Sequence, residues 1–472
     1  MSEPEVFDLI VIGAGPAGEN IAQYATEGTD LTAVLIDREL FGGECSYYAC
    51  MPSKALLRPI EVAATSHHLK GVSDAKLDVD ALISRRNYWV SNYEDSGQVK
   101  WAKGAGLEVI RGDASFAGPR QVRVSGEGGD RLLEARTAVV IATGTTAFVP
   151  DLYADCAPWG SRDATGIREV PDRLIIVGGG VVACEAATWL AAMGSHVTMI
   201  VRDERVLPRS EPFASEIVAT ALRDAGVDLR LKTDVSAVRR DGARDTGIGQ
   251  IHGGPVTVTL GDEEVEADEI LVAVGRCPAL DGLGLDVVGL DESSVLDGDL
   301  PDWLLAVGDA SGEAALTHWG KYRARVIGAQ IAARALGHPE PYEPTNVPVP
   351  QAIFTDPQVG SVGLTEAEAR EAGHDVVVAS TPWSSAAGSA LLQDDAKGGA
   401  QLVVDASSHR VLGATFVGPG AAELVHAATI AIVGGVPTEV LRHAVPSYPT
   451  ASELWLRLLE DLPPALRDRP TS

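Results

Sequence analysis

The strongest constraint on the fold is a pattern that occurs twice: an apolar strand, a glycine-rich turn, a helix and a second strand. The first copy has its turn at Gly13-Ala14-Gly15-Pro16-Ala17-Gly18, between apolar runs at 7–12 and 33–36. The second has its turn at Gly178-Gly179-Gly180, between runs at 174–177 and 196–201. This order predicts two βαβ units of parallel sheet, each with a dinucleotide pyrophosphate at its helix N-terminus.

The first fingerprint is complete. Its second strand ends at Asp37, near the offset of about 20 residues at which a carboxylate can bind the ribose hydroxyls. The residues expected to hold the first dinucleotide are therefore Gly13, Gly15, Gly18 and Asp37.

The second fingerprint has alanine at its third position, which still permits close packing of helix on strand. Its second strand ends at Val201 without an acid, and two arginines follow. A 2′-phosphate requires cations where a 2′-hydroxyl requires a carboxylate, so the sequence favours NADPH over NADH. Alternatively, the arginines are solvated charges compensated by Asp203 and Glu204. The residues expected to bind this dinucleotide are Gly178, Gly180, Ala183, Arg202 and Arg205.

Cys45 and Cys50 stand shortly after the first fingerprint, in the segment 42–54. Two thiols at this spacing can close a small disulfide ring where the chain bends or a helix begins, and a helix N-terminus favours the thiolate. Against a flavin, such a pair could pass electrons to an outside acceptor. Lys54 follows Cys50 by four residues on the same helix face, and Glu185 could pair with it. Half a zinc site is the alternative, but the sequence has no second cysteine pair with ligand spacing.

Composition narrows the class of protein. The chain of 472 residues has a formal net charge of −28, which argues against nucleic acid and anionic membranes as partners. Five cysteines do not make a secreted disulfide framework, and the acidic N-terminus does not look like a signal peptide. The sequence has no uncharged run of about 20 apolar residues, so we expect no membrane span. We therefore expect a cytoplasmic protein whose cysteine pair is catalytic.

The elements predict an α/β fold with two Rossmann-like dinucleotide-binding domains and a C-terminal α+β domain. A first, interrupted domain is expected over 1–150 and 279–345, a second over 151–278 and a third over 346–472. Helices are expected within 55–110, with strands at 138–141, 269–274 and 303–307. Beyond a Pro-rich linker at 339–350, strands are expected at 352–362, 400–404 and 411–417.

Taken together, the motifs resemble the flavoprotein disulfide reductases, the class I pyridine nucleotide-disulfide oxidoreductases that include dihydrolipoamide dehydrogenase, glutathione reductase and mercuric reductase. The resemblance covers nearly the whole chain. It rests on the segments 13–18 with Asp37, 42–54, 142–144, 178–185, 275–276, 308–309 and 354–357.

The resemblance implies FAD on the first dinucleotide unit and NAD(P)H on the second. Cys50 would lie against the flavin as the charge-transfer thiolate, and Cys45 would face the substrate as the interchange thiol. Lys54 and Glu185 would sit beside the isoalloxazine ring, and Asp309 would contact the ribityl chain. The further residues that it assigns to cofactor binding are Gly43, Thr143, Gly144, Gly275, Arg276 and Gly308. The last domain would form the interface of a homodimer whose active site is shared between subunits.

The C-terminal segment departs from the family. Disulfide-reducing members carry a His-Pro-Thr motif followed by a glutamate; here Tyr448 replaces the histidine, and Glu453 follows. A free tyrosine titrates at about pH 10, against about 6.5 for histidine, so it can donate a hydrogen bond but cannot readily accept the proton of a dithiol. Mercuric reductases resemble this chain in that tyrosine, but their C-terminal cysteine pair is missing, because no cysteine follows Cys277.

The sequence therefore predicts an FAD-dependent NAD(P)H oxidoreductase that passes electrons through the flavin and a Cys45–Cys50 disulfide to a small acceptor, which is a disulfide, a quinone or a metal ion. The partner subunit's Tyr448 would act as a hydrogen-bond donor in place of the usual base. Three alternatives stay open: a dihydrolipoamide dehydrogenase of a 2-oxoacid complex, a mercuric reductase-like enzyme, and a non-catalytic redox-sensing flavoprotein.

Overall fold

The computed structural model describes residues 3–126, 128–345 and 347–467, and the chain divides into two compact units. The first unit comprises Met1–Pro52, Arg86–Phe148 and Gly275–Pro344, and the second comprises Ser53–Arg85, Val149–Val274 and Thr345–Ser472. Both units contain sheets covered by helices, which confirms the predicted fold class. The predicted domain boundaries stay predictions.

A seven-stranded sheet is the framework of the first unit. Its order is β3-β2-β1-β6-β5-β4, and β16 also pairs with β6. The strands β3, β2, β1, β6 and β16 are parallel, whereas β4, β5 and β6 form an antiparallel meander. The bounds are β1 (Glu5–Ile12), β2 (Ala33–Asp37), β3 (Glu108–Arg111), β4 (Asp113–Gly118), β5 (Gln121–Ser125), β6 (Arg131–Ile141) and β16 (Leu304–Ala306).

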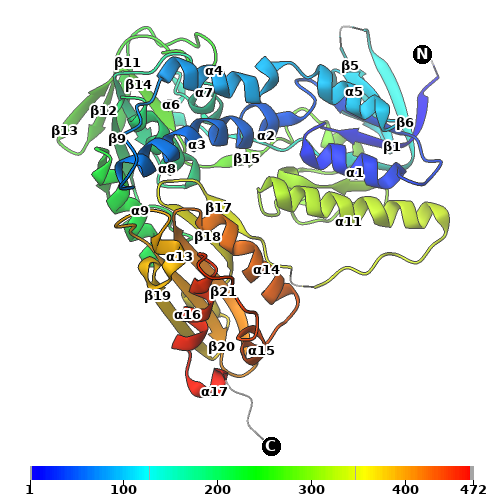
Figure 1. Ribbon diagram of the computed structural model, residues 1–472. Helices are drawn as coiled ribbons and strands as arrows, with labels where there is room; N and C mark the ends of the chain where they lie inside the picture. Colours follow the sequence, from blue (N-terminus) through cyan, green and yellow to red (C-terminus); the bar gives the residue numbers. More distant parts are fainter. Residues whose placement is uncertain (1–2, 127, 346, 468–472) are drawn as a thin grey trace, which may run out of the picture. The chain divides into compact units, whose positions relative to one another are not determined.

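Alternate residues of β1 enter two separate cores, because successive side chains of a strand point to opposite faces. Leu9 and Val11 pack with residues of α1 (Pro16–Thr26) and α11 (Thr317–Leu336), whereas Ile10 and Ile12 belong to the core on the other face. Figure 1 shows α1 and α11 side by side along this sheet. Burial on both faces is typical of a parallel strand between two layers.

The second unit contains the other predicted βαβ unit. Its four-stranded parallel sheet has the order β10-β9-β8-β14, and a separate antiparallel sheet consists of β11, β12 and β13. Helix α8 (Val181–Ala192) follows β8, and α9 (Pro212–Asp224) follows β9. The strands are β8 (Arg173–Val177), β9 (His196–Val201), β10 (Asp228–Leu231), β11 (Ala237–Arg240), β12 (Val256–Leu260), β13 (Glu263–Ala267) and β14 (Glu269–Val272).

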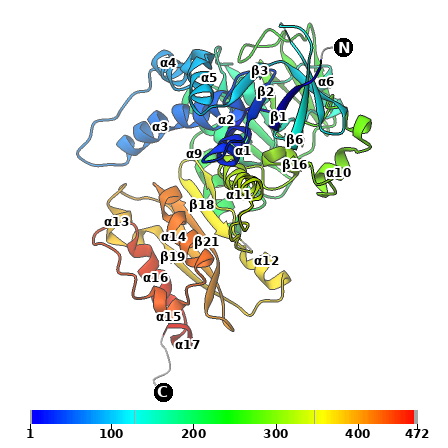
Figure 2. The same cartoon turned by 90° about the vertical axis from the view of Figure 1, so that its right-hand side faces the viewer.

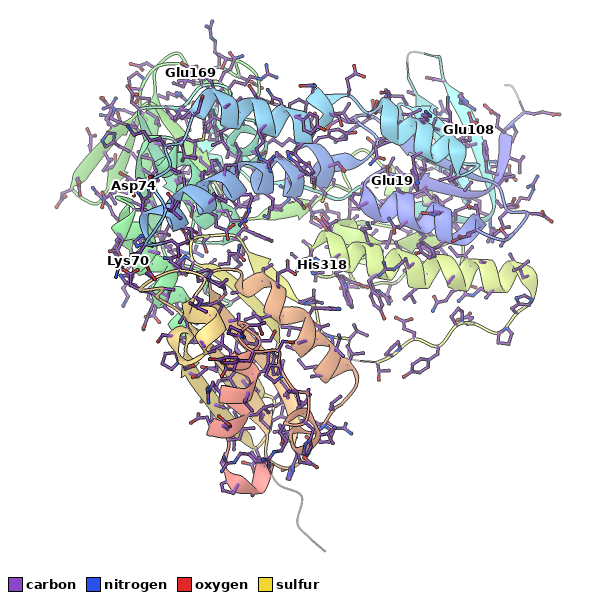
Figure 3. All side chains as sticks on the ribbon, in the orientation of Figure 1. Glu19, Lys70, Asp74, Glu108, Glu169 and His318 are labelled. Atoms are coloured by element: carbon purple, nitrogen blue, oxygen red, sulfur yellow. The ribbon has the colours of Figure 1, made fainter. Side chains whose placement is uncertain are left out.

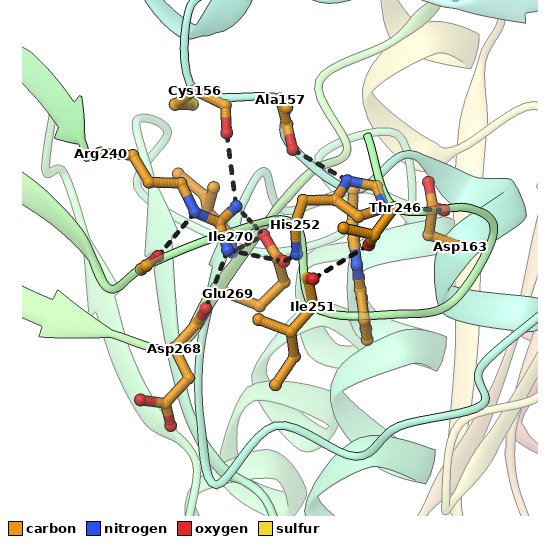
Figure 4. Close-up of polar contacts among 12 residues, drawn as sticks. Cys156, Ala157, Asp163, Arg240, Thr246, Ile251, His252, Asp268, Glu269 and Ile270 are labelled. Carbon is orange, nitrogen blue, oxygen red and sulfur yellow. Dashed lines mark hydrogen bonds and ion pairs between the residues drawn. The ribbon is translucent and has the colours of Figure 1, made fainter. Parts of the chain in front are cut away.

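A buried ion pair anchors the long connection between β11 and β12 (Figure 4). Arg240 and Glu269 form a bidentate pair with distances of 2.6 and 2.9 Å, and neither side chain is exposed. Glu269 also accepts hydrogen bonds from the backbone N–H groups of His252 and Ile270. The remaining donors of the guanidinium bind the carbonyls of Cys156, Gly254 and Asp268. A buried pair satisfied in this way ties the connection to the sheet.

A five-stranded antiparallel sheet of order β17-β18-β21-β20-β19 forms the C-terminal part of the second unit. Helix α14 (Val425–Val433) packs on β18 and β21, and α16 (Glu453–Asp461) packs on β19 and β20, as Figures 1 and 2 show. The strands are β17 (Gln351–Ile353), β18 (Gln358–Gly363), β19 (Val376–Pro382), β20 (Gly399–Asp405) and β21 (Arg410–Gly418).

The other α-helices are α2 (Gly43–Tyr47), α3 (Cys50–His67), α4 (Val79–Trp89), α5 (Ser96–Gly104), α6 (Asp151–Ala154), α7 (Ser161–Thr165), α10 (Glu292–Leu296), α12 (Glu366–Glu371), α13 (Ala387–Ala390), α15 (Thr438–Leu441) and α17 (Pro464–Arg467). Among the described residues, none of these helices combines the length and the apolar character that a membrane span requires.

Candidate active site

The first glycine turn brings three segments of the first unit into close contact. Gly13 has φ +103°, and a Cβ there would lie 2.3 Å from the carbonyl oxygen of Ala142, so only glycine fits between β1 and the end of β6. Asp37 ends β2, and its carboxylate accepts hydrogen bonds of 2.8 Å from the N–H groups of Ala14 and Glu39. Burial raises the pKa of Asp37, and these two hydrogen bonds oppose the rise.

The same region fits a bound dinucleotide. The Thr143 hydroxyl is buried and has no hydrogen-bond partner among the described residues, so a polar group of a ligand would satisfy it. A Cβ on Gly15, at the N-terminus of α1, would meet only Gly43 within 4 Å, which leaves the helix N-terminus open to an anion. Gly18 has no such space, because a Cβ there would lie 1.9 Å from the carbonyl oxygen of Gly13.

The two predicted thiols lie together at one end of the first unit. Cys45 is in α2, Cys50 begins α3, and both are partly exposed. The Sγ of Cys50 lies 3.3 Å from Oγ1 of Thr317, the first residue of α11. Figure 3 labels the next residue, His318, at that end of the helix. Hydrogen bonding to Cys50, together with burial, raises the pKa of Cys45, and the Thr317 hydroxyl opposes the rise.

Sequence reasoning missed Thr317 and the partner of Arg276. Arg276 begins β15 (Arg276–Pro278), which pairs with β7 (Thr145–Ala147). Its guanidinium donates to the hydroxyl and the carbonyl of Thr145, both at 2.7 Å, and to Glu44 at 3.2 Å. The Thr145 hydroxyl donates in turn to Asp309 at 3.1 Å. A polar chain thus joins α2, the β7–β15 ribbon and the Asp309 segment. The adjacent predicted residues Gly144, Gly275 and Gly308 all have positive φ.

The predicted lysine–glutamate pair is present in the second unit. Nζ of Lys54 lies 2.7 Å from Oε2 of Glu185, whose side chain is only 5% exposed. Oε1 of Glu185 accepts a 2.9 Å hydrogen bond from the backbone N–H of Phe354, and Lys54 lies over the Phe354 ring at 4.8 Å. The pair therefore joins α3, α8 and the start of the C-terminal sheet.

The second glycine turn repeats the geometry of the first. Gly178 has φ +126°, and a Cβ there would lie 2.3 Å from the carbonyl oxygen of Ala273. Gly180 caps the N-terminus of α8, where a Cβ would meet nothing within 4 Å, so the helix end is open to an anion. Ala183, in the first turn of α8, is fully buried.

Three cations gather at the end of β9. Arg202 is exposed, and Arg205 donates to the carbonyl of Pro208 at 3.0 Å. Lys232 follows β10, which pairs in register with β9, and its Nζ lies 3.5 Å from the exposed carboxylate of Glu204. Sequence reasoning missed Lys232 because the parallel pairing of β9 and β10, not the spacing along the chain, brings it here.

The two predicted C-terminal residues differ in their surroundings. The Tyr448 side chain is 76% exposed, between α15 and α16. Glu453 begins α16 and is 7% exposed. One oxygen of its carboxylate accepts a hydrogen bond from Arg457 at 2.8 Å, and the other is buried without a partner among the described residues.

Two glycine turns at helix N-termini, a neighbouring cysteine pair and a lysine–glutamate ion pair are the features expected of a redox enzyme that uses two nucleotide cofactors. Residues 7–317 match the family described as pyridine nucleotide-disulphide oxidoreductase, and residues 349–458 match its dimerisation domain. The chain belongs to the pyridine nucleotide-disulphide oxidoreductase family. The predicted recognition and the predicted FAD-dependent enzyme class are confirmed.

Relatives of known class agree with this placement. The chain is 33% identical to dihydrolipoyl dehydrogenase of Haloferax volcanii, with 96% of each chain covered. It is 29% identical to that of Bacillus subtilis, with 94% of this chain and 96% of the relative covered. The HOCl-induced flavoprotein disulfide reductase RclA from Escherichia coli has a similar structure, with a TM-score of 0.81 and 26% identity over 96% of this chain and 99% of its own.

Proposed function

We propose that this protein is an NADPH oxidoreductase whose Cys45–Cys50 pair delivers electrons to a small acceptor that needs no base to take up a dithiol proton. Disulfides, quinones and metal ions are the candidate acceptors. The observation that carries the proposal is Tyr448, which the sequence resemblance places at the position of the histidine of disulfide-reducing members and which is 76% exposed. A phenol O–H can donate a hydrogen bond to a thiolate or to the acceptor.

The residues of the first unit are suited to hold FAD and to move electrons by thiol chemistry. Gly13, Gly15 and Thr143 would hold the dinucleotide, and bound FAD would exchange electron pairs between the pyridine nucleotide and the thiols. The Thr317 hydroxyl, 3.3 Å from Cys50, can donate a hydrogen bond that favours the thiolate there.

A disulfide acceptor would be reduced in two exchange steps. The Cys45 thiolate attacks one acceptor sulfur, the acceptor S–S bond breaks, and the departing sulfur takes a proton. Cys50 then attacks Cys45, so that the Cys45–Cys50 bond forms and the second acceptor sulfur leaves and takes a proton. The acceptor gains two electrons and two protons, and the dithiol loses the same number.

The preference for NADPH is argued from charge. Arg202 and Arg205 follow β9 where a 2′-phosphate would lie, and Lys232 adds a third cation from the neighbouring strand. No carboxylate ends β9 to hold a free 2′-hydroxyl. Arg202→Ala should raise KM for NADPH and leave KM for NADH nearly unchanged. Equal changes in the two KM values would favour the alternative that the arginines are solvated surface charges.

A homodimer is proposed from the C-terminal part of the second unit, because residues 349–458 match a dimerisation domain. Its helix α14 and the following segment expose Ile430, Val433 and Val445, at 58%, 50% and 88%. Apolar exposure of this kind is typical of a surface that another subunit covers. Ile430→Asp should shift the mass in light scattering from dimer to monomer.

A second candidate function is dihydrolipoamide oxidation, since the relatives named above that are 33% and 29% identical are dihydrolipoyl dehydrogenases. That reaction runs from dithiol to nucleotide and requires a base for the dithiol protons. Rapid reduction of NAD⁺ by dihydrolipoamide, at a rate typical of metabolic enzymes, would favour this candidate over the proposal.

The deciding experiment reduces the purified holoenzyme anaerobically with NADPH or NADH while the long-wavelength thiolate-to-flavin absorbance is recorded. Disulfides, quinones and metal ions are then added in turn, and recovery of the oxidised spectrum identifies the acceptor. Cys45→Ser should keep the long-wavelength absorbance and lose thiol-dependent turnover. A fully active Cys45→Ser enzyme would mean that electrons leave without the thiol pair, and no recovery with any acceptor would favour a redox-sensing protein without turnover.

A further inference from the structure

Glu44 places a carboxylate immediately before the thiol residue Cys45. Both residues belong to α2, a helix of five residues, and the Glu44 side chain is 26% exposed. Its carboxylate contacts Arg276, which comes from a distant part of the chain in the same unit. The carboxylate next to Cys45 in the sequence is therefore paired with the first residue of β15.

The contacts of Arg276 give this pair a direction. Two of them go to Thr145, one to its hydroxyl and one to its carbonyl. A hydroxyl has a single hydrogen, and that of Thr145 points to Asp309, so the same oxygen must use a lone pair for Arg276. Arg276 therefore donates to Thr145, and Thr145 donates to Asp309. In the series Glu44, Arg276, Thr145 and Asp309, the formal charges are negative, positive, zero and negative.

The charges of Arg276 and Glu44 both affect the pKa of Asp309. Burial raises the pKa of Asp309; Arg276 opposes the rise, and Glu44 adds to it. The Arg276 guanidinium thus forms an ion pair with Glu44 and also lowers the pKa of Asp309. If Glu44 lost its charge, Arg276 would keep its two contacts with Thr145 but would no longer be neutralised from the side of α2.

We propose that Glu44 is a positioning residue that acts through Arg276 to lower the reduction potential of the flavin–dithiol centre. The carboxylate holds the guanidinium between α2 and Thr145 and cancels part of its positive charge. Reduction adds electrons to this region, and a nearby cation whose charge is less fully compensated favours the more negative, reduced state. The proposal rests on the family's FAD-dependent redox centre and is independent of which acceptor the enzyme uses.

The test measures the two-electron midpoint potential of the holoenzyme by anaerobic titration against a reference dye. Glu44→Gln should shift the potential upward by about 30 mV, which corresponds to a tenfold change in the two-electron equilibrium constant. The shift should shrink in 1 M salt, because the Debye length there is about 3 Å and the pair is partly exposed. Glu27→Gln, which removes an exposed carboxylate at the end of α1, should leave the potential unchanged.

A double-mutant cycle separates action through Arg276 from direct action on the thiols. In the Arg276→Gln background, Glu44→Gln should shift the potential by less than half as much as in the wild-type background. A full shift in that background, or no shift in the single variant with FAD retained, overturns the proposal.

FAD content is measured by flavin fluorescence after denaturation, because loss of FAD would itself change the measured potential. Glu44→Gln should retain FAD, because the two Thr145 contacts hold Arg276. Glu44→Asp keeps the charge on a side chain one methylene shorter, so it should show a smaller shift than Glu44→Gln. Loss of FAD from both variants would assign Glu44 to cofactor retention and would also overturn the proposal.

Discussion

Lys54 and Glu185 form an ion pair of 2.7 Å in which the two partners are buried to different degrees, with 34% of the lysine side chain exposed and 5% of the glutamate. Removal of the lysine leaves a buried carboxylate with one remaining donor, the N–H of Phe354. Removal of the glutamate charge leaves a lysine that solvent can reach. The cost of breaking the pair should therefore depend on which partner is changed.

We expect Lys54→Met to lower the free energy of unfolding by about 2–3 kcal/mol and Glu185→Gln by less than about 1 kcal/mol. The glutamine carbonyl can still accept from Phe354 or from Lys54. Urea denaturation of the two variants provides the comparison. A larger loss in Glu185→Gln would mean that the pair stabilises the fold mainly through the lysine.

Glu19, labelled in Figure 3, has a buried side chain on α1. From its burial we predict that the stability of the protein depends on pH. Burial raises its pKa from 4.5 to about 8, with Lys321 opposing the rise and Asp37 adding to it. Between these values the folded state holds a proton that the unfolded state has released. The free energy of unfolding therefore falls as pH rises from about 4.5 to about 8.

Glu19→Gln should remove this penalty and raise the free energy of unfolding at pH 7 by an amount on the order of 2–3 kcal/mol, with no gain at pH 4. Urea titrations across pH 4–9 measure the difference. The matched control is again Glu27→Gln, at the exposed C-terminal end of the same helix. A gain that is equal at pH 4 and pH 7 would show that packing, not protonation, separates the variants.

The Arg240–Glu269 pair should be among the most sensitive sites in the second unit. Arg240→Met leaves a fully buried carboxylate without its cation, and we expect a loss of about 3–5 kcal/mol in the free energy of unfolding. Glu269→Gln in the same chain should recover part of that loss, because the amide oxygen can accept from His252 and carries no charge. Thermal and urea unfolding measure both; no recovery in the double variant would mean that the lost arginine contacts with carbonyls carry the cost.

Much of the scaffold could be predicted from local patterns. The runs that lead into both glycine turns became β1 and β8, and β9 has the predicted bounds, because a strand buried on both faces is apolar throughout. The expected strand at 352–362 is instead β17 and β18, separated by the Phe354–Pro357 turn. The available signal was Asp356-Pro357, because an Asp-Pro pair favours the start of a turn.

Helix α11 was not expected, because apolar residues are not concentrated on one face of it. Its contact with α1 depends on small residues instead: Gly320, Ala324 and Gly328 follow at intervals of four. A Cβ on Gly328 would lie 2.8 Å from the Cβ of Tyr24 on α1. Small residues spaced by about one helical turn were the available signal for this helix.

Thr317 makes a testable contribution to thiol reactivity. Its hydroxyl lowers the pKa of Cys45, although contact with Cys50 and burial raise that pKa overall. Thr317→Val, a change of similar volume, should raise the pKa further and slow alkylation of Cys45 by iodoacetamide at pH 8. Site-resolved mass spectrometry of the reduced protein across pH 7–10 measures the rate, and Thr317→Ser should behave as wild type. Equal alkylation rates for the valine and serine variants would show that the Thr317 hydroxyl does not affect the reactivity of Cys45.

The last prediction concerns Tyr448, at the position where the sequence resemblance expects a histidine base. Tyr448→His would place an imidazole that titrates at about pH 6.5 at the position where disulfide-reducing relatives have one. Glu453 follows five residues later, at the start of α16, where the sequence resemblance expects the glutamate that orients the histidine. General base catalysis contributes about 10²–10⁴-fold. We expect at least a tenfold gain in NAD⁺ reduction by dihydrolipoamide, and no gain in Tyr448→Phe. A wild-type rate that already equals that of the histidine variant would show that the tyrosine does not limit dithiol oxidation, and the enzyme would then be an ordinary dihydrolipoamide dehydrogenase.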